Sequence, residues 1–139
     1  MPENTGYTLG KEERLSSRKQ IDWLFSGNAN HAITAFPIRM VYAESSVIGE
    51  ESDANDSVKA KIMVSVSKRH FKRAVRRNRV KRQLREAYRL NKHLLDAALA
   101  KKKGTQLLIA FVWLDDKLHD SERVNNRMHN LLCRLSERL

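Results

Sequence analysis

The sequence predicts an α+β domain in which one β-sheet is packed with helices, with the elements in the order α-β-β-α-β-α. Two observations predict this class. Hydrophobic residues alternate with polar ones in some segments, as in half-buried strands, and recur every three to four positions in others, as in amphipathic helices. The two kinds of segment are interspersed along the chain. With 139 residues, no internal repeat and no long linker, residues 1–139 are expected to form a single domain.

The N-terminal part of the chain predicts an arm, a helix and a strand. Residues 1–14 are polar and contain several turn-forming residues, so we expect a loose arm. Ser17, with Gln20 three positions later, resembles a capping box and starts a short helix that Gly27 ends. The apolar face of this helix consists of Ile21, Leu24 and Phe25. Residues 33–42 are then expected to form one strand, whose hydrophobic face consists of Phe36, Ile38, Met40 and Tyr42.

The remaining elements follow from the same two periods. Residues 44–57 are acidic and small, which is typical of a mobile loop. Residues 59–67 alternate as a second strand, and a helical period then extends over about residues 73–103, with a break allowed near Asn91. Residues 106–114 are apolar on both faces and predict a buried strand. A final amphipathic helix carries Val124, Met128, Leu131, Leu132, Leu135 and Leu139.

The positive charge of the chain is concentrated in one segment. The chain has 27 Lys and Arg against 16 Asp and Glu, a net charge of +11. Twelve of these basic residues lie between Lys68 and Lys92, where Glu86 is the one acidic residue, so the rest of the chain is neutral. A single concentrated basic segment indicates a polyanionic partner.

The composition also bounds the compartment. The longest apolar run, residues 107–114, is far too short to cross a membrane, and no signal peptide is visible. The single cysteine, Cys133, can form no internal disulfide and gives no metal-ligand spacing. We therefore expect a cytoplasmic protein with no membrane contact.

The basic segment forms one face of the predicted long helix. On a helical wheel, the apolar stripe that starts at Val80 lies opposite Asn78, Arg82, Arg85 and Arg89. A solvated helix face is the ordinary explanation of such a charge run. However, a solvated face mixes charge signs to form pairs three or four residues apart. Here, moreover, cations crowd the first turns, where the helix dipole disfavours them. These features favour the binding of a nucleic acid or another polyanion.

At this point the residues resemble a known family. The segment SVSKRHFKRAVRRNRVKRQLREAYR, residues 65–89, is similar to the signature of the bacterial ribonuclease P protein subunit. The matching parts are Ser67-Lys68-Arg69, Ala74-Val75, Arg77-Asn78-Arg79, Val80, Lys81-Arg82 and Arg85-Glu86. Upstream, Leu15, Ile21, Phe25 and Gly27 have spacings like those of that family's first helix.

The resemblance implies both a fold and a function. The single RNA-binding domain would have a fold like domain 2 of ribosomal protein S5, with a left-handed βαβ crossover. The protein would join a catalytic RNA subunit and assist the Mg²⁺-dependent endonucleolytic removal of the 5′ leader from precursor tRNA. The RNA would perform the catalysis, and Mg²⁺ would be held mainly by the RNA subunit and the substrate. No protein partner, catalytic residue or metal ligand in the chain is implied.

The resemblance also assigns binding residues. The RNA-binding residues would be Lys68, Arg69, Lys72, Arg73, Arg76, Arg77, Asn78, Arg79, Lys81, Arg82, Arg85 and Arg89. The leader would bind in a cleft between the sheet and the first helix, on Ile21, Phe25, Phe36 and Ile38. Aromatic side chains there could stack on bases. Ordinary core packing is the alternative explanation for each of these four residues.

Two other functions remain open at this level. A ribosomal or other structural RNA-binding protein would carry a similar charge and have no role in cleavage. A metal-dependent nuclease could use an acidic cluster beside a histidine, formed by Asp115, Asp116, His119 and Asp120. The simpler interpretation of that cluster is a solvated loop in which Asp120 or Ser121 caps the last helix.

Overall fold

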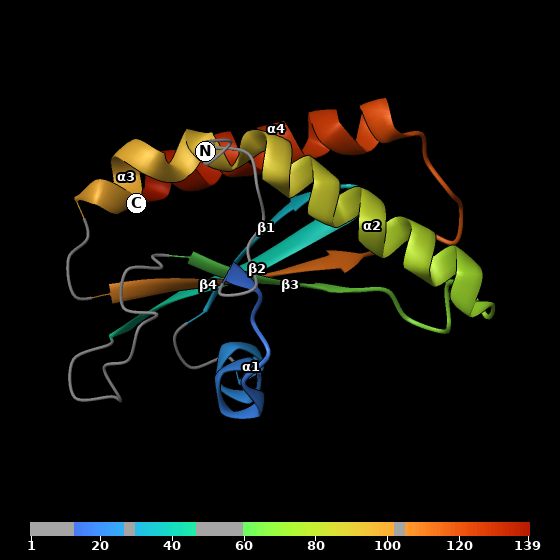
Figure 1. The fold of residues 1–139 in the computed structure, drawn as a ribbon, viewed down its shortest axis with the longest axis horizontal. Coiled ribbons are helices and arrows are strands. Elements are labelled where there is room, and N and C mark those ends of the chain that lie inside the picture. Colours follow the sequence, from blue (N-terminus) through green and yellow to red (C-terminus); the bar gives the residue numbers. More distant parts are fainter. Residues whose placement is uncertain (1–12, 27–29, 47–59, 102–104) are drawn as a thin grey trace, which may run out of the picture.

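The computed structural model describes residues 13–26, 30–46, 60–101 and 105–139. Most of the predicted arm and acidic loop, together with Gly27 and Gly104, lies outside these ranges. Residues 44–46, predicted to begin the loop, instead form the end of a strand that pairs with residues 105–107, so the prediction is wrong there. The elements are α1 (Arg18–Phe25), β1 (His31–Ala35), β2 (Ile38–Ser46), β3 (Ala60–Ser65), α2 (Ala74–Asn91), the 3₁₀ turn η4 (Lys92–Leu95), α3 (Asp96–Ala100), β4 (Thr105–Trp113) and α4 (Ser121–Arg138) (Figure 1).

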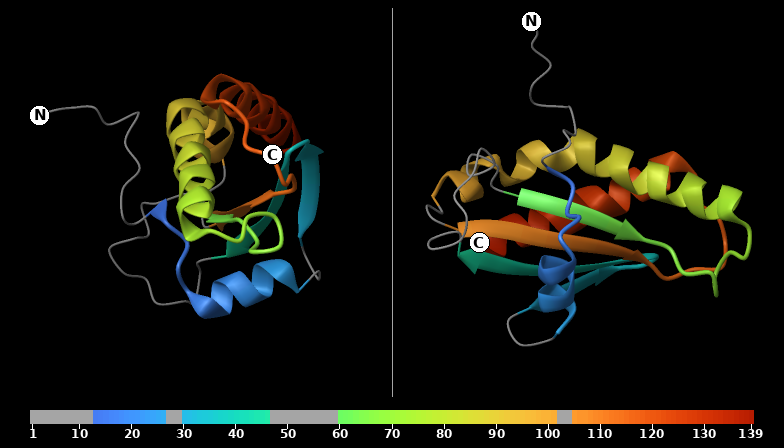
Figure 2. Two further views of the ribbon diagram at one scale, coloured as in Figure 1. Left: turned by 90° about the vertical axis from the view of Figure 1, so that its right-hand side faces the viewer. Right: turned by 60° about the horizontal axis from the view of Figure 1, so that its bottom comes forward.

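The four strands form one mixed sheet in the order β1-β2-β4-β3. The pairs β1–β2 and β2–β4 are antiparallel, whereas β3 and β4 are parallel. The chain joins β3 to β4 through α2, η4 and α3, and Figure 2 shows that this crossover is left-handed. Nearly all such connections in proteins are right-handed. The predicted α+β class, one sheet packed with helices, is confirmed.

Helices cover the sheet on both faces (Figure 1). On one face α2 and α4 pack over the main core, to which they contribute Val80, Leu84, Ala87, Tyr88, Val124, Met128, Leu131, Leu132 and Leu135. These residues form the apolar stripes that the helical period predicts. On the other face α1 covers a smaller core of Leu15, Leu24, Val41, Ala43, Leu108 and Ala110. Among the described residues, no helix is long and apolar enough to span a bilayer.

The single strand predicted over residues 33–42 is a hairpin, so the prediction is wrong in this detail. The turn consists of Phe36 and Pro37, after which β2 pairs back on β1 with Ala35 opposite Ile38. Proline has no N–H to donate to a neighbouring strand, and it commonly marks a strand end. The turn also separates Phe36, which is exposed, from Ile38, which is buried in the main core.

The long helix breaks where the sequence allows a break. Asn91 is buried at the end of α2, and its Nδ2 donates to the Ala87 carbonyl at 2.9 Å and to Asn125 Oδ1 at 2.7 Å. Short polar side chains of this kind compete with the backbone and favour helix ends. The predicted caps are also present, since Ser17 Oγ accepts from the Gln20 N–H and Asp120 Oδ1 from the Arg123 N–H.

Candidate nucleic-acid interface

The outer side of α2 carries a shallow basic hollow. The inner side of the helix is buried in the main core, which fixes the direction of the outer residues. This hollow, here called the α2 hollow, has a volume of about 530 Å³. It is lined by Arg14, Asn78, Lys81, Arg82, Arg85, Glu86 and Arg89. The residues that the wheel places opposite the apolar stripe therefore come together on one surface.

Positive charge in the α2 hollow is poorly compensated. Glu86 is the single acidic residue in its lining, and Glu86 accepts from Arg89 Nε at 3.1 Å. This hydrogen bond lowers the pKa of Glu86, and the Glu86 carboxylate is paired with Arg89. Burial, and then the charge of Arg14, lower the pKa of Arg85. Crowded cations of this kind are stabilised by an anionic ligand.

The turn before α2 extends the basic surface. Lys68, Arg69, Lys72, Arg73, Arg76 and Arg79 all have exposed side chains. The helix begins after Arg73, which makes no side-chain cap hydrogen bond, and the first turn contains no acidic residue. The free N–H groups and the positive end of the helix dipole therefore add to the charge of these side chains.

Arg77 differs from the other predicted RNA-binding residues. Its Nη1 donates to the Phe71 carbonyl at 2.9 Å and to the Lys72 carbonyl at 2.8 Å. The guanidinium therefore fastens the turn before α2 to the helix, and the side chain is half-buried. The charge pattern alone could not separate this arginine from its neighbours, because the two acceptors are backbone atoms.

A second, smaller hollow lies beside the edge strand β3. This hollow, here called the β3 groove, has a volume of about 290 Å³. It is lined by Arg14, Leu15, Ser16, Ile62, Met63, Val64 and Arg85. The chain before α1 forms one wall, because Arg14 pairs with Ile62 as a parallel bridge and the Leu15 N–H donates to the Ile62 carbonyl at 2.7 Å. The sequence predicts a loose arm over residues 1–14 and gives no sign that Arg14 pairs with the sheet, so the prediction is wrong at Arg14.

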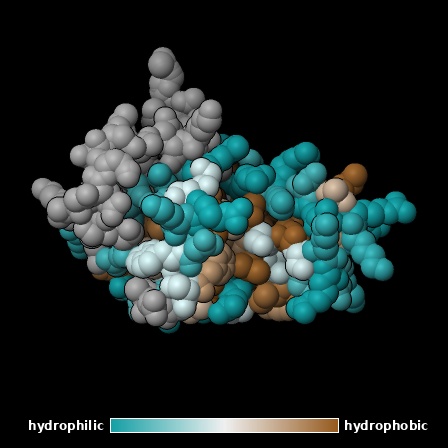
Figure 3. Space-filling model, turned by 90° about the horizontal axis from the view of Figure 1, so that it is seen from below, coloured by the Kyte–Doolittle hydropathy of each residue, from teal (hydrophilic) through white to brown (hydrophobic). Residues whose placement is uncertain are grey.

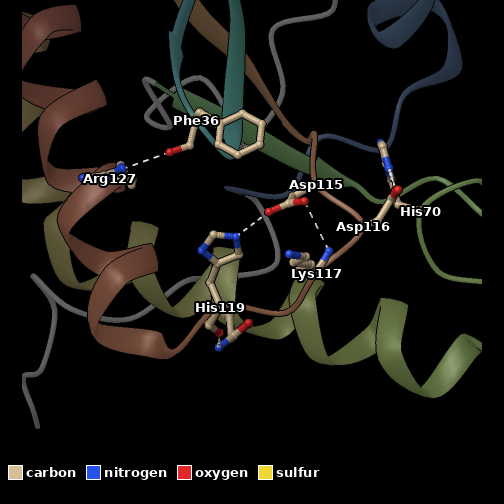
Figure 4. Close-up of polar contacts among 8 residues, drawn as sticks. Phe36, His70, Asp115, Asp116, Lys117, His119 and Arg127 are labelled. Atoms are coloured by element: carbon tan, nitrogen blue, oxygen red, sulfur yellow. Dashed lines mark hydrogen bonds and ion pairs between the residues drawn. The ribbon is translucent and has the colours of Figure 1, made fainter.

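The four predicted leader-binding residues do not lie together. Phe25 is 46% exposed on α1, and Ile21 is half-buried against the α1-side core. Phe36 is exposed at the β1–β2 turn, where its carbonyl accepts from Arg127 Nε of α4 at 2.9 Å (Figure 4). Ile38 has no exposed surface and packs on the opposite face of the sheet from α1, so its predicted place in a cleft with α1 is wrong.

The face that carries α1 nevertheless presents apolar surface. Figure 3 shows this face, with hydrophobic residues gathered at its centre and hydrophilic residues around them. Phe25 and Trp23 are large exposed hydrophobic residues on α1, whose inner side is anchored by the buried Leu24. Exposed aromatic residues on an anchored helix are able to stack on unpaired bases.

The acidic cluster after β4 makes structural contacts (Figure 4). Asp115 Oδ2 pairs with His119 Nε2 at 2.7 Å, and this hydrogen bond lowers the pKa of Asp115. Asp116 pairs with His70 at 2.6 Å, which ties the turn before α2 to the loop before α4. Asp120 caps α4, as predicted. Among the described residues, no group of three His, Cys, Asp or Glu could hold a metal ion.

The fold and its surface define the chain as a small α+β protein with a basic helix on a left-handed crossover. The sequence profile described as Ribonuclease P matches residues 9–135. The chain therefore belongs to the ribonuclease P protein family. It is 41% identical over 130 residues to the "Ribonuclease P protein component" of Porphyromonas gingivalis, covering 94% of this chain and 88% of that protein. The protein of the same name from Idiomarina loihiensis is 35% identical over 90 residues, or 65% of this chain and 63% of the relative.

Solved structures of the family share the fold. The ribonuclease P protein from Thermotoga maritima superposes with a TM-score of 0.63 at 21% identity, covering 88% of this chain and 96% of that chain. The ribonuclease P protein from Staphylococcus aureus gives a TM-score of 0.57 at 15% identity, covering 88% and 94% of the two chains.

Proposed function

We propose that this chain is the protein subunit of a ribonuclease P that removes the 5′ leader from precursor tRNA. It binds the catalytic RNA subunit through the α2 hollow and the basic turn before it. The RNA performs the hydrolysis, with Mg²⁺ held mainly by the RNA subunit and the substrate. The observation that carries the proposal is the poorly compensated basic surface of α2 in a member of this family.

The geometry of α2 suits phosphate binding. Guanidinium groups form bidentate, charge-assisted hydrogen bonds to phosphate oxygens. The helix that carries them is held rigidly, because its buried side packs on the sheet and on α4. Neutralising phosphates also releases counterions, so affinity is expected to fall steeply with salt. Protein cations that neutralise phosphates of the catalytic RNA and of precursor tRNA also reduce the repulsion between the two RNAs. The complex should therefore form at a lower Mg²⁺ concentration.

The leader is proposed to contact the α1 side of the sheet. Phe25 is the main candidate for stacking on a leader base, and Ile21 supports it from the same helix. Phe36 lies on the β1–β2 turn, so it can take part in substrate binding only from a separate place. Stacking tolerates different bases, which fits leaders of varied sequence.

The decisive experiment is cleavage of precursor tRNA by the catalytic RNA with and without this protein. We expect the protein to allow cleavage at low Mg²⁺ concentrations at which the RNA alone is nearly inactive. If the protein binds ribosomal RNA and leaves cleavage unchanged at every Mg²⁺ concentration, it is instead a structural RNA-binding protein.

A salt titration tests whether the α2 hollow is the binding surface. Each phosphate that the protein neutralises adds about 0.7–0.9 to the log–log slope of affinity against salt. The Lys81→Gln, Arg82→Gln double variant should therefore flatten that slope by about 1 to 2 units. The matched control is Arg123→Gln with Arg138→Gln, which removes the same charge from exposed positions on α4. Equal slopes for the two double variants would exclude the α2 hollow as the surface that binds RNA.

A further inference from the structure

Two arginines join the two hollows. Arg14 and Arg85 are the residues common to the linings of the α2 hollow and the β3 groove. Arg14 comes from the chain before α1, whereas Arg85 comes from the middle of α2, so the junction is formed by segments far apart in the sequence. The two hollows therefore adjoin at these two residues.

The charges at this junction are mutually repulsive. Burial and the charge of Arg14 both lower the pKa of Arg85, which means that the folded protein disfavours this pair of cations. Among the described residues, neither guanidinium makes a hydrogen bond or ion pair, and the acid in the α2 hollow, Glu86, is paired with Arg89. Two cations held close together without a shared acid form a site for one anion.

Arg14 is held in this unfavourable position by its neighbours. On one side, Glu13 forms a half-buried ion pair with Lys92 Nζ at 2.8 Å, beyond the end of α2. On the other side, the Leu15 N–H is bonded to the β3 edge. Figure 2 shows this segment crossing at the β3 side of the sheet before it enters α1. The backbone is therefore fixed on both sides of the arginine.

We propose that Arg14 and Arg85 form a clamp for a single phosphodiester group of an RNA strand that passes from the α2 hollow into the β3 groove. The Glu13–Lys92 ion pair positions Arg14 in this clamp. The inference rests on the proposed function, since it takes RNA as the partner. It adds a residue from the N-terminal segment to the binding surface, and it gives an acidic residue a role in binding a polyanion.

The clamp is tested with Arg14→Gln, Arg85→Gln and the double variant, assayed for binding to the catalytic RNA with precursor tRNA. The matched control is Arg18→Gln, since Arg18 is exposed on α1 and lines neither hollow. We expect each single variant to weaken binding about tenfold, which is the effect of removing one charge-assisted hydrogen bond. The control should change affinity less than about twofold.

The double variant distinguishes one shared phosphate from two separate ones. If both arginines hold one phosphate, the second substitution adds little, and the double variant binds about 10- to 20-fold more weakly with a salt slope flattened by about 0.7–0.9. A decrease near a hundredfold, with twice that change in slope, would overturn the clamp. So would an Arg14→Gln variant that matches Arg18→Gln. If the unaltered protein fails to bind the RNA, it is the proposed function that fails.

Glu13→Gln tests the positioning role by the sign of its effect. Removing an acid should strengthen binding to a polyanion on charge alone. If Glu13 positions Arg14, the variant should instead weaken binding about threefold or more. The same change should have no such effect in the Arg14→Gln background. The control is Glu137→Gln, an exposed acid on α4.

The positioning role is also tested from the other partner of the ion pair, Lys92. Lys92→Gln breaks the same ion pair from the other side, but it also removes a cation. In the Arg14→Gln background only this loss of charge should act, so Lys92→Gln should weaken binding less there than in the unaltered protein. Urea unfolding of each variant confirms that the protein is folded at the assay temperature. Tighter binding by Glu13→Gln, or equal weakening in both backgrounds, would overturn the positioning role.

Discussion

The substitution Arg77→Gln should lower the free energy of unfolding of the protein. The side chain donates two hydrogen bonds to the carbonyls of Phe71 and Lys72, which hold the turn before α2. A hydrogen bond that involves a charged group contributes about 1.5–3 kcal/mol when it is well enclosed. Because this site is only half-buried, water can replace part of that contribution, and we expect about 2 kcal/mol for the two bonds together.

The assay is urea unfolding of Arg77→Gln beside Arg76→Gln. Arg76 is the preceding residue, its side chain is exposed, and its substitution removes the same charge. A destabilisation of about 2 kcal/mol corresponds to a decrease in Tm of about 6 °C for a chain of this size, whereas Arg76→Gln should lie within about 0.5 kcal/mol of the parent. Equal unfolding midpoints for the two variants would refute the structural role of Arg77.

Three further predictions concern the last helix, the acidic cluster and α1. Asp120→Ala should cost about 1 kcal/mol of stability by removing the cap of α4, as measured by urea unfolding, and should leave cleavage unchanged. His119 lowers the pKa of Asp115, so this contribution to stability is present above the ordinary carboxyl pKa and is lost as the pH falls through the lowered value. Asp115→Asn should therefore reduce the decrease in stability between neutral and acidic pH, and an unchanged pH profile would contradict this. Phe25→Leu should weaken the binding of precursor tRNA with a leader of several nucleotides by about 1–3 kcal/mol and spare a substrate with a single-nucleotide leader. Equal effects on the two substrates would exclude stacking of Phe25 on a leader base.

The period of the hydrophobic residues is sufficient to predict the helices and the faces they bury. Val80 and Leu84 lie one turn apart and both are fully buried, so the opposite side of α2 is fixed by geometry. This is why Arg82 and Arg85 line the same hollow, as the wheel predicts. The caps at Ser17 and Asp120 are also predictable, because a cap depends on residues only three positions apart.

The errors arise where the outcome depends on a turn or on distant segments. The alternation continues through Phe36 and Ile38, so the period alone does not show that the chain reverses between them. Pro37 is the local signal of that reversal. The position of Arg14 has no local signal, because it depends on pairing with β3, far along the chain.

The sequence of α2 is poorly suited to an isolated helix. Its first turn has cations and no acid, and its N-cap residue makes no cap hydrogen bond, so an isolated helix of this sequence would be weak. Packing supplies the missing stability, since Val80, Leu84, Ala87 and Tyr88 are buried against the sheet and α4. Because the buried side holds the helix, the outer side does not need the mixed charges that usually stabilise a surface helix. The outward positions can then be occupied by cations, and a bound polyanion would relieve the repulsion that remains among them.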